Sequence, residues 1–220
     1  MENILKKQLV EDIPKTNRMD KRRLATRSKL LTATLDLVVE KGIDKTTMDD
    51  ITEKADLGRR TLYYHFDSKE ECVVASAAEF YTHIAAQADE SAHQHQDPAL
   101  AFAIAGQLVI RQLINAPVTK KLIAHPHLLA AAIKASVSSY AHQDMMLGME
   151  QERFSMALHG PLLDTTVLWA LVGILIDTID SDLVVDESLA YFTQIHLVFL
   201  GLPRDEAQSI ALEAAGITRQ

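Results

Sequence analysis

The sequence is poor in the residues that interrupt helices or cross-link loops. Its 220 residues include one cysteine, eight glycines and six prolines, and aromatic residues make up only 5%. A single cysteine excludes an internal disulfide and any zinc site built on several cysteines. No proline lies between Lys15 and Asp97, and alanine, leucine, glutamate and lysine are abundant. The composition therefore predicts an all-α protein.

Long apolar runs and catalytic signatures are missing as well. No uncharged stretch reaches the roughly 20 residues of a membrane-spanning helix, and the N-terminal residues lack the apolar segment of a secretory signal. The two closest glycines are 12 residues apart, which excludes a glycine-rich phosphate loop, and there is no G-x-S-x-G element. We therefore expect a cytoplasmic protein without a membrane partner, a cofactor or an enzymatic activity.

Charge is distributed unevenly along the chain, whose net charge is −8. Residues 1–69 hold 15 of the 22 lysines and arginines but only 12 of the 30 acidic residues, a net charge of +3. Residues 70–220 hold the other 7 basic and 18 acidic residues, a net charge of −11. The asymmetry indicates a basic N-terminal segment on an acidic body, with a chance cluster of lysines as the alternative.

Two predicted helices follow a weakly periodic N-terminal tail at residues 1–20. Apolar residues recur at helical spacing from Lys21 to Gly42, where a glycine suits the positive φ of a helix C-terminus. A short helix is predicted after Thr46 or Thr47, because an aspartate three residues later completes a capping box. The expected inner faces are Leu24, Leu30, Leu31, Leu35, Leu37 and Val38 in the first helix and Met48, Ile51 and Ala55 in the second.

The stretch GRRTLYYHF, from Gly58 to Phe66, is the most informative part of the sequence. On a helix, Leu62 and Phe66 share one face and are expected to pack inward. Two arginines, a threonine, two tyrosines and a histidine then point outward. Residues 56–58 predict a tight turn before this helix, and the capping box SKEE at 68–71 predicts the start of a long helix after it.

Three helices, the last two short and joined by a tight turn, predict a helix-turn-helix DNA-binding domain at residues 21–67. The exposed side chains suit a major groove: arginine pairs with guanine or phosphate, hydroxyls and histidine reach phosphates, and aromatic rings contact thymine methyl groups. The alternative is an amphipathic helix whose tyrosines cover a neighbouring domain.

Residues 68–220 are predicted to form a larger helical domain. The segments 162–180 and 186–201 are the most apolar, which favours burial in a core together with an interface between two copies. A simple monomer core is the alternative. The expected helices are 68–92, 98–115, 118–124, 127–147, 150–159, 162–180, 186–201 and a short one at 204–214.

The run from Arg27 to Glu71 resembles the DNA-binding domain of TetR-type transcriptional regulators. The resemblance lies in EKGIDKTTMDDITEKA and, above all, in RRTLYYHFDSKEE. It implies a helical homodimer, with an interface through the helices near 162–180 and 186–201, and two heads that read a near-palindromic operator in double-stranded DNA. It also implies a small-molecule effector that enters the C-terminal domain and releases a repressor from the operator.

The resemblance assigns roles to individual residues. This chain departs from the family pattern in having Ala-Asp-Leu-Gly at 55–58, where relatives often have Ala-Gly-Val-Ser, and arginine at 60, where they often have glycine. The operator sequence therefore cannot be transferred from relatives. The implied DNA contacts are Arg27, Thr47 and Lys69 to phosphates, Arg59, Arg60 and Thr61 to bases, and Tyr63, Tyr64 and His65 to backbone and thymine.

His65 adds an expectation about pH. If it must be protonated to meet a phosphate, DNA binding weakens above about pH 7, because the reference pKa of histidine is near 6.5.

An effector pocket is expected among the helices between residues 80 and 170, mostly apolar with a few polar anchors. Each candidate is also an ordinary core residue type. The candidates are Phe80, Phe102, Met145, Met149, Phe154, His159 and Trp169.

The nine histidines raise the question of a metal. His93 and His95 lie in one polar loop, and His125 and His127 flank a proline. Because no carboxylate cluster accompanies them in the sequence, we expect exposed histidines and no metal site.

Three hypotheses stay open on the sequence alone. The first is a DNA-binding repressor released by a small molecule, and the second is a constitutive DNA-binding dimer without an effector. The third is an all-α enzyme, which the missing catalytic motifs disfavour. Operator release by a small molecule would separate the first two, and turnover of a substrate would support the third.

Overall fold

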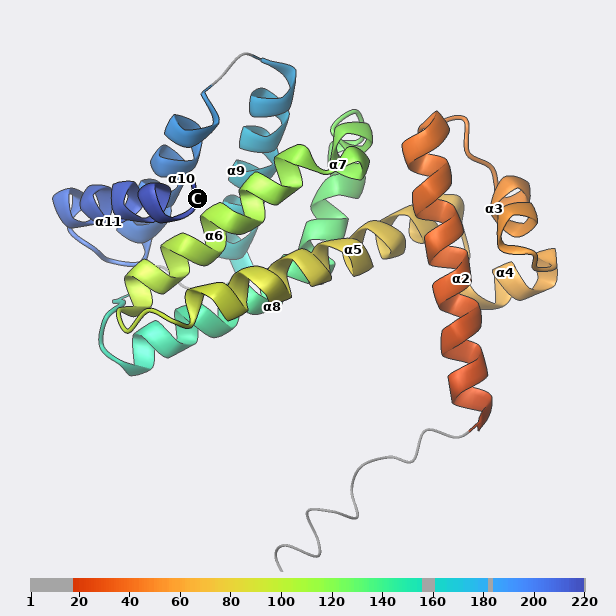
Figure 1. Ribbon diagram of the computed structural model, residues 1–220, viewed down its shortest axis with the longest axis horizontal. Helices are drawn as coiled ribbons and strands as arrows, with labels where there is room; N and C mark the ends of the chain where they lie inside the picture. The colour runs from red at the N-terminus through yellow and green to blue at the C-terminus, as the bar shows by residue number, and fades with distance from the viewer. Residues whose placement is uncertain (1–17, 156–160, 182–183, 220) are drawn as a thin grey trace, which may run out of the picture.

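The computed structural model describes residues 18–155, 161–181 and 184–219. Within these ranges every regular element is a helix, which confirms the all-α prediction. The head, which we define as α2–α4, lies at one end of the molecule, and the body, α5–α11, forms the rest (Figure 1). The helices are α2 (Arg18–Lys41), α3 (Met48–Ala55), α4 (Arg59–His65), α5 (Lys69–Ala92), α6 (Pro98–Asn115), α7 (Pro117–Leu122), α8 (Pro126–Glu150), α9 (Pro161–Asp180), α10 (Val185–Phe199) and α11 (Arg204–Ile217).

The first helix begins earlier than expected. Residues 18–20, predicted to belong to the N-terminal tail, form the start of α2. Leu24, predicted to face inward, is 59% exposed, whereas Leu30 is completely buried. Only the later turns of α2 are buried against other helices, so the prediction for Leu24 is wrong although the predicted helix itself forms.

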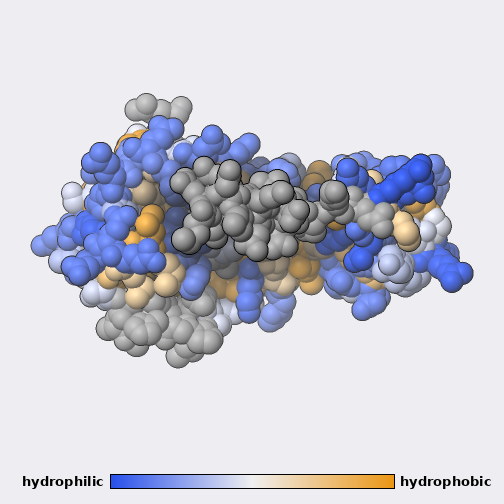
Figure 2. All heavy atoms as spheres, turned by 90° about the horizontal axis from the view of Figure 1, so that it is seen from below, coloured by the Kyte–Doolittle hydropathy of each residue, from blue (hydrophilic) through white to orange (hydrophobic). Residues whose placement is uncertain are grey.

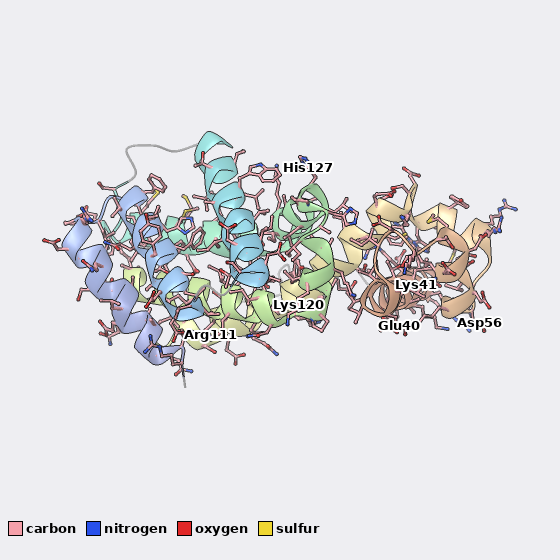
Figure 3. The ribbon with its side chains drawn as sticks, turned by 90° about the horizontal axis from the view of Figure 1, so that it is seen from above. Glu40, Lys41, Asp56, Arg111, Lys120 and His127 are labelled. Carbon is pink, nitrogen blue, oxygen red and sulfur yellow. The ribbon has the colours of Figure 1, made fainter. Side chains whose placement is uncertain are left out.

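The turns of the head follow the chemistry of their residues. Gly42 ends α2 with φ of +83°, a conformation that costs glycine little. Thr47 caps α3: its hydroxyl accepts a hydrogen bond from the backbone N–H of Asp50 (3.2 Å), and the carboxylate of Asp50 accepts one from the backbone N–H of Thr47 (2.8 Å). Asp56 takes the left-handed conformation, with φ of 53°, in the turn toward α4. This turn lies at the outer end of the head (Figure 3).

Helix α4 rests on two buried side chains. Leu62 and Phe66 are 0% and 3% exposed and join the core of the head, as predicted. Ser68 caps α5 by accepting a hydrogen bond from the backbone N–H of Glu71 (3.1 Å). The carboxylate of Glu71 accepts a hydrogen bond from the backbone N–H of Asp67 (2.6 Å), one residue before the cap. The predicted cap therefore forms, with its return bond shifted by one residue.

Head and body share one core. Val38 and Ile43, at the end of α2, belong to the same buried cluster as Tyr81 of α5 and Leu122 of α7. The hydroxyl groups of Tyr81 and Thr119 are 2.8 Å apart and join α5 to α7 inside this core. In the body, α5, α6 and α8 lie side by side, and α10 and α11 pack together at the far end (Figure 1).

One predicted helix of the body is wrong. The segment 150–159 was expected to be helical, but α8 ends at Glu150 and residues 151–155 turn without forming a helix; 156–160 lie outside the described residues. Buried Phe154 and the Arg153 guanidinium hold this turn, since Arg153 bonds Asp97 (2.8 Å) and Glu206 (2.7 Å). The other body helices agree with the expected ranges within a few residues.

Helix α6 is the one described helix whose length and composition would suffice to cross a membrane. Half of its 18-residue window is buried inside the protein, as in a core helix. On the face shown in Figure 2, hydrophilic residues cover most of the head and hydrophobic residues form patches along the body.

Candidate nucleic-acid interface and internal cavity

The outer face of α4 carries the exposed groups that the sequence indicated. Tyr63 and Tyr64 are 56% and 71% exposed, and the neighbouring Arg60 is exposed too. Thr61 and His65, on the flank, are half-buried. An exposed tyrosine pair beside an arginine, on a helix fixed by Leu62 and Phe66, is a surface that can contact an extended polar partner.

The two adjacent arginines of α4 differ in their partners. Arg59 forms an ion pair with Asp49 of α3, and both side chains are largely exposed. Arg60 has no ion pair within the described part of the chain. A surface ion pair contributes at most about 1 kcal/mol, so Asp49 orients Arg59 without fixing it, while Arg60 is available to an outside anion.

Thr47 and Asp50 form a small network at the start of α3. The Thr47 hydroxyl donates to the Asp50 carboxylate (2.6 Å), and the Lys41 ammonium lies 2.7 Å from the same carboxylate. Hydrogen bonds from Lys41 and Thr47 lower the pKa of Asp50 to about 2. The Thr47 hydroxyl thus has a structural role in addition to the phosphate contact that the resemblance implies.

The remaining predicted DNA-contacting residues lie where the head meets the body. The Arg27 guanidinium lies 5.3 Å from the centre of the Phe66 ring and 3.8 Å from the Glu79 carboxylate. The Lys69 ammonium donates to the backbone oxygen of Ile43 (3.1 Å). Both cations thus have contacts within the protein, and the Arg27 side chain remains 42% exposed.

His65 is less basic than an isolated histidine. Burial lowers its pKa, and the positive charges of Arg23 and Arg27 lower it further. At pH 7 its imidazole is therefore mostly neutral, and the pH range over which it titrates lies below that expected from an unperturbed histidine.

A cavity of about 510 Å³ lies within the body, in the size range of small-molecule sites. Its wall comes from α5, α6, α8, α9 and α10 and is mostly apolar. The polar exceptions include Asp89, Asp144, Tyr140 and His196. These residues come from three helices far apart in sequence, so no local motif could have indicated that they meet.

Of the six predicted effector residues that the structure describes, Phe102 and Met145 line this cavity. Phe154 and Met149 pack in the neighbouring core cluster, and Phe80 packs against the main core near α2. Trp169 is 40% exposed, with its ring 5.3 Å from that of His127. His159 lies outside the described residues.

His196 of α10 is a polar group inside this apolar wall. Its ring makes T-shaped contacts with Phe192 (centroids 4.3 Å apart) and Phe102 (6.2 Å). Its Nε2 is buried and has no hydrogen-bond partner in the described part of the chain. Burial lowers the pKa of His196 to about 4, so the ring is neutral at pH 7.

The structure brings two carboxylates close to one of the histidines, a grouping that the sequence did not indicate. Asp89, His93 and Asp144 can place one ligand atom each within 4.8 Å of one another. The backbone oxygen of Asp89 lies 2.8 Å from Nδ1 of His93 and raises the pKa of the imidazole. Burial and the nearby Asp89 raise the pKa of Asp144 to about 6. The three groups could supply a partial metal site, one ligand short of a structural zinc site.

A helix-turn-helix head joined to a larger helical body with an internal cavity is typical of regulators whose DNA-binding part and sensing part lie in the same polypeptide. The family model "Bacterial regulatory proteins, tetR family" matches residues 30–75, which span most of the head and the start of α5. The head of this chain is thus similar to that of TetR-family regulators.

Curated relatives match over part of their length. The HTH-type transcriptional regulator YxbF of Bacillus subtilis is 31% identical over 154 residues, which are 64% of this chain and 38% of YxbF. The negative transcriptional regulator IcaR of the biofilm operon icaADBC in Staphylococcus epidermidis is 42% identical over 45 residues, 20% of this chain and 24% of IcaR. The chain thus covers less than two fifths of the length of either relative.

Solved structures extend the likeness to the body. RolR in complex with resorcinol aligns with a TM-score of 0.74 and 23% identity, over 87% of this chain and 95% of that one. FadR of Thermus thermophilus in complex with lauroyl-CoA aligns with a TM-score of 0.64 and 13% identity, over 80% and 96% of the two chains. At these identities the likeness establishes the shared fold.

Proposed function

We propose that the chain is a sequence-specific DNA-binding transcriptional repressor that a small-molecule effector releases from its operator. The observation that carries the DNA-binding part is α4, whose Leu62 and Phe66 are buried while Arg60, Tyr63 and Tyr64 are exposed. Aromatic and cationic side chains on a short helix after a tight turn match the groups that a major groove accepts.

The proposal divides the chain by role. Residues 21–67 bind DNA, and residues 68–220 bind the effector and dimerise. In each head, Arg27, Thr47 and Lys69 contact phosphates, Arg59, Arg60 and Thr61 contact bases, and Tyr63, Tyr64 and His65 contact backbone and thymine.

The second half of the proposal is a homodimer through α9 and α10. Large apolar side chains remain exposed on both helices, among them Trp169, Tyr191, Val198 and Phe199. A second copy that covers them would bury apolar area and place two heads for two half-sites about 34–36 Å apart.

The effector site is the cavity. RolR and FadR, which share the fold, were solved with resorcinol and with lauroyl-CoA, so this fold accommodates small ligands in related proteins. We take repression as the direction of control from IcaR, a relative whose name states negative regulation. In this chain the cavity wall includes α5 and α6. Helix α5 continues to the head, and α6 leads to α7, which packs on α2, so a ligand that moves either helix changes the spacing of two heads.

DNA binding by the full chain tests the proposal directly. Fluorescence anisotropy on a labelled duplex should give an affinity that falls linearly on a log–log plot against salt, because phosphate contacts release counterions. Absence of binding to any duplex at low salt would contradict the proposal. A constitutive DNA-binding dimer is the second candidate; it predicts the same salt dependence and no small molecule that weakens binding. The proposal includes no catalytic step, and turnover of a substrate would contradict that part.

A further inference from the structure

The cavity differs from an ordinary apolar core in one respect: it contains a buried hydrogen-bonding atom without a partner. Nε2 of His196 is excluded from solvent and has no hydrogen-bond partner among the described residues. Leaving such an atom unpaired costs the desolvation free energy that a hydrogen bond would offset. His196 lines the cavity, so a ligand inside it that displaces the side chains covering Nε2 can supply the missing partner.

The surroundings of His196 favour a flat aromatic ligand. Phe192 and Phe102 both stand at nearly right angles to the imidazole, with interplanar angles of 81° and 89°. The aromatic ring of a ligand can make a further edge-to-face contact with this group of three rings. The adjoining wall, which includes Val109, Ile110 and Leu171, is aliphatic and suits the rest of an apolar molecule.

The polar groups of the wall favour a ligand that donates a hydrogen bond and carries no negative charge. In the tautomer that carries its proton on Nδ1, Nε2 of a neutral imidazole accepts a hydrogen bond from a hydroxyl group. Asp89 and Asp144, on the same cavity, only accept when ionised and would repel a carboxylate or phosphate. Lys134 also borders the cavity, but it is an exposed residue, where a charge pair contributes little.

We propose that the effector is a neutral aromatic molecule with a phenolic hydroxyl group, and that Nε2 of His196 recognises this hydroxyl. The inference rests on the proposed function for the cavity as the effector site. It assigns His196 as the residue that sets specificity within that site.

Isothermal titration calorimetry on the full chain, without DNA, tests the recognition. The probes are phenol, 2-naphthol and 4-phenylphenol, the methyl ether of each, and the matching carboxylates. The ether keeps the ring and removes the donor, so wild type should bind at least one phenol about tenfold more tightly than its ether. His196→Leu should remove this preference, and His196→Gln, which keeps a hydrogen-bonding group, should retain part of it. His83→Leu, the same change at an exposed histidine of α5 outside the cavity, should behave as wild type.

Several results would overturn the proposal: ethers that bind wild type as well as the phenols, carboxylates that bind more tightly, or no binding by any phenol. An unchanged phenol preference in His196→Leu would do the same. The comparison of phenol with ether uses the wild-type protein alone, so it tests whether the cavity prefers a hydroxyl donor even if His196→Leu fails to fold.

Operator binding, measured separately with and without the best phenol, distinguishes this inference from the proposed function. If phenols bind through His196 but leave DNA affinity unchanged, the effector role fails and the recognition stands. If the chain binds DNA but no phenol, the recognition fails and the DNA-binding proposal stands.

Discussion

Replacement of Arg60 by alanine is the sharpest local perturbation of the proposed DNA surface. Arg60 is exposed on α4 and has no ion pair in the described part of the chain, so its loss removes no internal contact of that kind. Surface substitutions of this type change the free energy of unfolding by about 0.5 kcal/mol or less. The structure therefore predicts a variant that folds and melts like wild type.

The expected loss of DNA affinity is much larger. A bidentate arginine–guanine contact contributes roughly 1–3 kcal/mol of discrimination, and a dimer makes the contact in both half-sites. Arg60→Ala should therefore weaken binding to the preferred duplex by about 2–6 kcal/mol, or about 30-fold or more. Binding to a scrambled duplex of the same length should change far less, since phosphate attraction dominates there.

Fluorescence anisotropy on the preferred and scrambled duplexes measures both effects, and urea unfolding checks stability. Arg204→Ala is the matched control, because it removes the same charge from an exposed position on α11, at the opposite end of the molecule (Figure 1). Equal losses in the two variants would show that only net charge matters. An unfolded Arg60→Ala, or one that binds the preferred duplex like wild type, would refute the placement of this face.

Four further predictions each concern a single residue. Asp49→Asn should strengthen DNA binding several-fold, because it frees Arg59 and removes a negative charge near the phosphates; anisotropy that shows weaker binding would contradict this. Thr47→Ala should lower the free energy of unfolding by about 1 kcal/mol through loss of the cap, with Thr47→Ser near wild type, as measured by urea titration. Burial lowers the pKa of His196 to about 4, so between about pH 6.5 and pH 4 the unfolded chain binds a proton at this residue that the folded chain does not. The free energy of unfolding should therefore fall by up to about 3 kcal/mol as the pH drops through this range. Unfolding of His196→Leu, measured over the same pH range, should lack this component. Tyr191→Glu should shift the proposed dimer toward monomer in sedimentation velocity, since Tyr191 is 65% exposed on the proposed interface. A wild-type dimer that the substitution leaves unchanged would place the interface elsewhere.

The sequence predicted the head well because its determinants are local. Gly42, Thr47 and Asp56 each act on the backbone within a few residues, so their identities alone indicate where helices begin and end. The buried pair Leu62 and Phe66 follows from helical spacing. These rules need no knowledge of distant contacts.

Predictions that depended on tertiary contacts were less complete. Leu24 fits the helical period but lies in turns of α2 that no other helix buries. Residues 151–155 turn because Arg153 meets two acidic partners from distant segments. The cavity brings Asp89, Asp144 and His196 together from three helices, and no spacing in a single sequence contains that information.

Selection of bound duplexes from a randomised DNA pool by the purified full chain at moderate salt tests the central claim most directly. The account predicts recovery of an inverted repeat, with half-sites about one helical turn apart, because two α4 helices would enter successive major grooves. Recovery of no preferred sequence, from protein shown to be folded and free of ligand, would contradict it.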